Sequence, residues 1–149
     1  MDAKQFVNKI VDDNQALFRA SQINVKAYFD SKPAQEELVE HFVGRMVNER
    51  MNMVEIAARV ASMPMSTPPE ELQMLSKQAF DEAVHFHMVK EVVEYLSGEA
   101  LDLEQAAAEE ARKPQAKGAA LLAKYETAEN PAALALYQFM AEGRAERNW

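Results

Sequence analysis

Apolar residues recur at intervals of three and four along most of the chain, and the strict alternation of a half-buried strand is lacking. Only four glycines and six prolines interrupt the pattern, and they gather in short breaks with serine, lysine or asparagine. The pattern therefore indicates an all-α fold. It predicts helices over roughly residues 3–29, 34–62, 68–97, 101–112, 116–127 and 131–149.

The lengths of these helices indicate long antiparallel hairpins in one helical-bundle domain that spans residues 1–149. Thr67 and Glu70 have the spacing of a capping box at the start of the helix after the second break. The alanine-rich stretch 100–123 predicts short helices that cross the bundle. No internal repeat and no domain boundary is evident.

Two glutamates occupy positions that the pattern reserves for apolar side chains. In the helix over 34–62, Glu49 fills the gap in an apolar row formed by Leu38, Phe42, Met46, Met53, Ile56 and Val60. In the helix over 68–97, Glu82 interrupts the row of Leu72, Leu75, Ala79, Phe86, Val89, Val93 and Leu96. We therefore expect both carboxylates to point into the core.

The spacing around the connecting turn predicts that these carboxylates face each other. Glu49 precedes the middle of the turn by about sixteen residues, and Glu82 follows it by about the same number, which means equal height in an antiparallel hairpin. His85 leaves the same side of its helix one turn after Glu82. Two facing buried carboxylates repel each other, and a cation between them reverses the sign of that energy.

A Glu and a Glu-x-x-His at one level form half of a carboxylate-bridged di-metal centre in a helix bundle. Carboxylate together with imidazole favours iron or manganese over calcium. The alternative is structural: Glu49 reaches a solvated edge, and His85 is an ordinary half-buried histidine.

Charge and composition narrow the classes of function. The formal net charge is −8 and the isoelectric point is about 4.9, which argues against nucleic acid and against an anionic membrane surface. No apolar run is long enough to cross a membrane. Cysteine is absent, so thiolate metal sites and disulfides are excluded, and a cytoplasmic location is expected.

With Glu49, Glu82 and His85, the chain resembles the ferritin-like di-iron carboxylate superfamily, such as oxygenases of the phenylacetyl-CoA epoxidase type and tRNA hydroxylases. The resemblance covers about residues 36–149 and implies an antiparallel bundle with a short-helix crossover over 99–130 and an extra N-terminal helix. It also implies that Glu142 is a further ligand, with Glu146 as its rival. Glu82 would bridge the metals, Glu49 and Glu142 would be terminal or bridging ligands, and His85 would be a terminal ligand.

The chain departs from this superfamily in lacking a second Glu-x-x-His. His41 lies on a polar stripe with Arg45, Asn48 and Asn52, which predicts a solvated side chain rather than a ligand. The pattern is still helical at Trp149, so the last ligand helix would lie beyond it. Three explanations stay open: a fragment, a second chain or second copy that completes the bundle, and a degenerate member without chemistry.

The leading hypothesis is therefore an oxidoreductase with two iron ions that activates O2 to oxidise a small organic substrate, with an external electron donor. A metal-free helical structural or interaction subunit is the alternative from a different class. An iron-handling protein of ferritin type is the third possibility.

Overall fold

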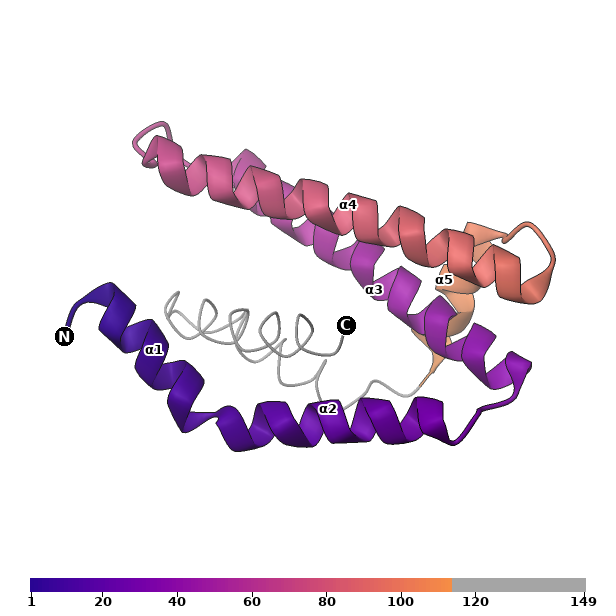
Figure 1. Cartoon of the computed structure of the whole chain (residues 1–149). Coiled ribbons are helices and arrows are strands. Elements are labelled where there is room, and N and C mark those ends of the chain that lie inside the picture. The colour runs from indigo at the N-terminus through magenta and orange to yellow at the C-terminus, as the bar shows by residue number, and fades with distance from the viewer. Residues whose placement is uncertain (114–149) are drawn as a thin grey trace. The chain divides into compact units, whose positions relative to one another are not determined.

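The structure is a computed structural model that describes residues 1–113 (Figure 1). These residues form five α-helices and no β-strand: α1 (Ala3–Asp13), α2 (Gln15–Asp30), α3 (Gln35–Ser62), α4 (Pro69–Ser97) and α5 (Leu103–Arg112). Helices α3 to α5 belong to one compact unit, Ala34–Lys113, and α1 and α2 belong to another. The all-α class predicted from the sequence is confirmed for this part of the chain.

The N-terminal helix predicted over 3–29 is wrong at Asn14, where the structure has two helices instead of one. The Asn14 side chain donates a hydrogen bond from Nδ2 to the carbonyl oxygen of Ile10, at 2.8 Å, and its backbone N–H bonds to the carbonyl oxygen of Val11. Asparagine competes in this way with the regular backbone ladder. The apolar spacing continues through the break, which is why periodicity alone did not reveal it.

Helices α3 and α4 lie side by side and antiparallel (Figure 1). The segment 63–68 joins them and contains Pro64 and Pro68, so the helical ladder cannot continue through it. The predicted bounds, 34–62 and 68–97, agree with the observed helices to within one residue. The predicted capping box is wrong, because the N-cap residue of α4 is Pro68 and no side chain caps the helix.

Helix α4 ends at a glycine for a steric reason. Gly98 has φ of 74°, in the left-handed region that residues with a Cβ rarely adopt, and its N–H bonds to the carbonyl oxygen of Glu94. The Glu94 carboxylate accepts hydrogen bonds from the Lys90 ammonium and, at 3.1 Å, from the Leu101 N–H, and both lower the pKa of Glu94. The turn after α4 is thus tied to the last turn of the helix.

Helix α5 packs against α3, as the predicted short crossing helix requires. Asp102 caps it by accepting a hydrogen bond from the Gln105 N–H. The Glu110 side chain lies against Gly44, where an added Cβ would come within 3.4 Å of the carboxylate. An added methyl group at position 44 would thus meet Glu110 at an ordinary van der Waals distance, and Gly44 marks the place where α3 contacts α5.

The apolar core of this unit joins all three helices. Met46 of α3, Val89 of α4 and Ala106 of α5 are buried together, and partly buried residues surround them. Met46 and Val93 are the most completely buried large side chains, and each contributes about 1.5–3 kcal/mol through removal from water. None of the described helices combines the length and the apolar content that a membrane crossing requires.

Candidate metal centre

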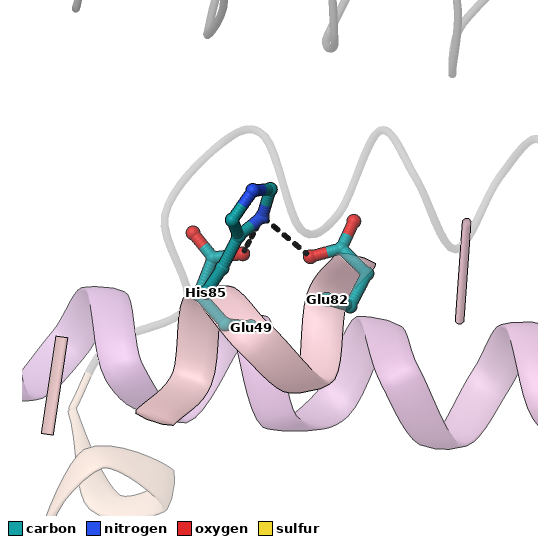
Figure 2. A group of neighbouring side chains, drawn as sticks. All are labelled: Glu49, Glu82 and His85. Carbon is teal, nitrogen blue, oxygen red and sulfur yellow. Dashed lines mark ion pairs between the residues drawn. The ribbon is translucent and has the colours of Figure 1, made fainter. Parts of the chain in front are cut away.

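Helices α3 and α4 bring together the three residues that the sequence singled out. Glu49 lies near the middle of α3, and Glu82 and His85 lie one turn apart near the middle of α4. Figure 2 shows that the three side chains project to the same side of the two helices, with the imidazole close to both carboxylates. The predicted equal height of positions 49 and 82 is therefore confirmed.

The donor atoms of the cluster converge. Nδ1 of His85 is 3.4 Å from Oε2 of Glu49 and 3.8 Å from Oε2 of Glu82 (Figure 2). One donor atom from each residue lies within 4.8 Å of the others. Because each bond from a transition metal to nitrogen or oxygen is about 2.1 Å, two donors of one ion lie at most about 4.2 Å apart. The two distances from Nδ1 of His85 are within that limit, and the 4.8 Å within which all three donors lie is slightly above it.

The two carboxylates are withdrawn from water, and the imidazole is not. Glu49 is 8% exposed and Glu82 is 4% exposed, while the side chain of His85 is 51% exposed. Removing an ionised carboxylate from water costs several kcal/mol unless charge or hydrogen bonds compensate it, and two neighbouring carboxylates repel each other. The fold therefore holds both buried carboxylates at one level of the hairpin, next to a histidine that is open to solvent.

Arg45 supplies positive charge to the cluster, although the sequence pattern indicates only that it lies on a polar stripe. Its Nε atom is 3.2 Å from Oε1 of Glu49, one helical turn away, and its side chain is 29% exposed. The sequence spacing could have indicated this ion pair, because Arg45 and Glu49 are four residues apart and such residues are neighbours on the surface of a helix. With His85 neutral, the formal charges of Arg45, Glu49 and Glu82 leave one net negative charge.

These residues fit a divalent transition-metal ion. Carboxylate oxygens and an imidazole nitrogen are the ligands that iron, manganese and zinc take in proteins, and here two packed helices bring them together. The cluster could therefore hold a metal ion, whose identity the donor set leaves open.

The remaining sequence predictions concern His41 and the residues after 113. His41 is exposed, as expected, with its ring edge-on to the Phe42 ring at a centroid distance of 5.2 Å. Partial burial and the nearby Arg45 guanidinium lower the pKa of His41. The candidate ligand Glu142, its rival Glu146, and the helices predicted over 116–127 and 131–149 lie outside the described residues.

Comparison of the chain with known protein families, with curated proteins and with solved structures found no match.

Proposed function

We propose that this chain is an O2-dependent oxidoreductase in which Glu49, Glu82 and His85 bind one side of a di-iron centre. The observation that carries the proposal is the burial of two facing carboxylates at 8% and 4% exposure, with an imidazole nitrogen 3.4 Å and 3.8 Å from their oxygens. A purely structural hairpin gains nothing from this placement, since apolar residues of similar volume would stabilise it at least as well.

Each residue has a definite task in this proposal. Glu82, the most deeply buried of the three, would be the ligand shared by the two ions, Glu49 would be a terminal or bridging ligand, and His85 would be a terminal ligand. The apolar layer around Met46 and Val89 lies on the same two helices as these ligands. Iron, when bound, would supply the binding and reduction of O2.

The remaining ligands, the substrate and the electron source belong to the proposal as classes. Glu142 is the candidate for a further carboxylate ligand, and a second copy or a second chain is the candidate for the missing histidine. The substrate would be a small organic molecule, and an external reductant would supply electrons. Manganese is the alternative metal, because the same ligands accept it.

Metal content tests the proposal directly. Protein purified without chelator should contain iron or manganese in amounts comparable to the chain, as measured by elemental analysis. Glu82→Gln should lose most of this metal. Glu109→Gln, which changes an exposed glutamate of α5 in the same way, should keep it. Equal and negligible metal in all three proteins would contradict the proposal.

A second function, a metal-free helical structural subunit, has one observation in its favour. Arg45 already compensates part of the charge of Glu49 in the absence of any ion, with Nε 3.2 Å from the carboxylate. In that case, iron added under air would produce no near-ultraviolet oxo-bridge absorption, and Glu82→Ala would leave the metal content unchanged. The near-ultraviolet absorption and the metal content of Glu82→Ala therefore separate the two functions.

A further inference from the structure

The two oxygens of the Glu49 carboxylate face different partners. Oε1 lies 3.2 Å from Nε of Arg45, and Oε2 lies 3.4 Å from Nδ1 of His85. Only Oε2 is therefore directed toward the other donors of the cluster. The Arg45 side chain is about one-third exposed, so its charge acts in a medium that screens less than bulk water.

The Arg45 contact has opposite consequences with and without a metal ion. Without metal, Glu49 and Glu82 bring two buried negative charges together, and the guanidinium, which stays protonated in proteins, offsets part of their repulsion. With a divalent cation at the cluster, the same guanidinium is a nearby like charge and holds one of the ligand oxygens. Arg45 therefore stabilises the metal-free state more than the metal-bound state.

We infer that Arg45 is an internal counter-ion that competes with the metal ion for Glu49 and so lowers the metal affinity of the Glu49–Glu82–His85 cluster. This inference rests on the metal site of the proposed function. Since ligand binding and the stability of the metal-free state are linked, removing the competitor should tighten metal binding and destabilise the metal-free protein together. With Arg45 beside Oε1, Oε2 would be the Glu49 oxygen that is open to the metal ion.

The experiment compares the whole chain with Arg45→Met, which keeps most of the side-chain length and removes the charge. The control is Arg50→Met, which removes the same charge from an exposed position of α3. Mn²⁺ is titrated into chelator-treated protein by calorimetry, and the thermal midpoint is measured with and without Mn²⁺. A second substitution, Arg45→Gln, serves if the methionine variant does not fold.

Arg45→Met should bind Mn²⁺ about tenfold more tightly, the effect of one charge a few ångströms from the ion in a partly screened site. Its metal-free thermal midpoint should fall, and the rise produced by Mn²⁺ should be larger than in the unmodified chain. Adding Glu49→Gln to Arg45→Met should remove most of the loss in the metal-free midpoint, because the carboxylate that needs a counter-ion is gone. Arg50→Met should change neither quantity.

Two negative results have different meanings. If the unmodified chain binds Mn²⁺ and Arg45→Met binds it equally or more weakly, Arg45 does not compete and the inference is overturned, while the proposed metal site stands. If neither protein binds Mn²⁺, the proposed function fails, and the competition fails with it.

Discussion

Two groups of carboxylates on the same three-helix unit illustrate how burial, rather than number, makes an acidic cluster chemically significant. One is the cluster of Glu49 and Glu82 at the middle of the α3–α4 hairpin. The other lines a cleft of about 560 Å³ between the start of α3 and the ends of α4 and α5, and contains Glu36, Glu40, Glu109 and Glu110. The cleft has more carboxylates, but most of them are exposed.

The two groups compensate their charge differently. In the cleft, the Lys113 ammonium contacts the Glu110 carboxylate and lies 3.0 Å from Oε1 of Glu40, and water screens the other carboxylates. In the cluster, two carboxylates at 8% and 4% exposure share one arginine and one histidine. An exposed ion pair is worth about 0.2–1 kcal/mol, whereas buried charge costs several kcal/mol without compensation. Only the cluster should therefore respond strongly to a divalent ion.

The largest expected effect is the loss of metal binding on neutralising the buried carboxylate. Glu82→Gln should weaken Mn²⁺ binding by about a hundredfold or more, since even residues that only orient metal ligands account for about 10–100-fold. Calorimetric titration measures the change. Glu36→Gln in the cleft is the matched control and should bind Mn²⁺ like the unmodified chain. Equal weakening in both variants would remove the distinction between the two groups.

Added metal should raise the thermal stability of the protein through the cluster alone. At a free Mn²⁺ concentration of 100 times the Kd, binding contributes about 2.7 kcal/mol. For a chain of this size that corresponds to a rise of about 5–10 °C in the Tm. Differential scanning calorimetry should show the rise in the unmodified chain and in Glu109→Gln, and its absence in His85→Ala. A rise that persists in His85→Ala would locate the metal elsewhere.

In the absence of metal, the same neutralisation should have the opposite sign. Glu82→Gln relieves the repulsion between two buried carboxylates, so the metal-free variant should be more stable than the unmodified chain by about 1 kcal/mol. Glu40→Gln in the cleft should stay within about 0.5 kcal/mol of it, as is usual for exposed substitutions. Urea unfolding in the presence of chelator measures both. A clear destabilisation by Glu82→Gln would mean that the charges are already compensated.

The cleft should respond weakly and only at alkaline pH. Hydrogen bonds to Glu110 and to Glu40 raise the pKa of Lys113 above its ordinary value of 10.5. A raised pKa in the folded state contributes stability that is fully present below pH 10.5 and is lost as the pH rises through the higher value. Lys113→Met should reduce this loss and cost less than about 1 kcal/mol at neutral pH. Thermal unfolding between pH 8 and 12 measures the difference.

The smallest effect concerns His41, one turn before Arg45. Partial burial and then the Arg45 charge lower the pKa of His41 below 6.5. A lowered pKa means that this residue's contribution to stability is present above pH 6.5 and is lost as the pH falls. Arg45→Met should raise the pKa of His41 without restoring it fully, because burial remains. Titration of the histidine signals by NMR follows the change, and a pKa that does not move would argue that Arg45 points away from His41.

The sequence predicted much of the described fold because the strongest signals are local. Prolines and a glycine mark the bounds of α3 and α4, and the row of apolar side chains made the two glutamates conspicuous. The break at Asn14 escaped prediction because it depends on one side chain bonding to its own backbone at Ile10. The spacing of apolar residues carries no information about such a hydrogen bond.

The sequence predicted the three donor residues of the candidate site. It did not predict which residue compensates their charge. Equal distance from one turn was enough to place Glu49 opposite Glu82. The contact of Arg45 with Glu49 depends on the rotamers of two long side chains, which spacing permits but does not determine. A polar residue beside a buried row is therefore worth testing as a counter-ion before it is assigned to the solvated face.

The most direct test is the location of a bound ion in crystals grown with Mn²⁺. We expect an anomalous difference peak within about 2.2 Å of carboxylate oxygens of both Glu49 and Glu82 and of a nitrogen of His85. A well-ordered crystal with no such peak at these three side chains, or with manganese only among the cleft glutamates, would contradict it.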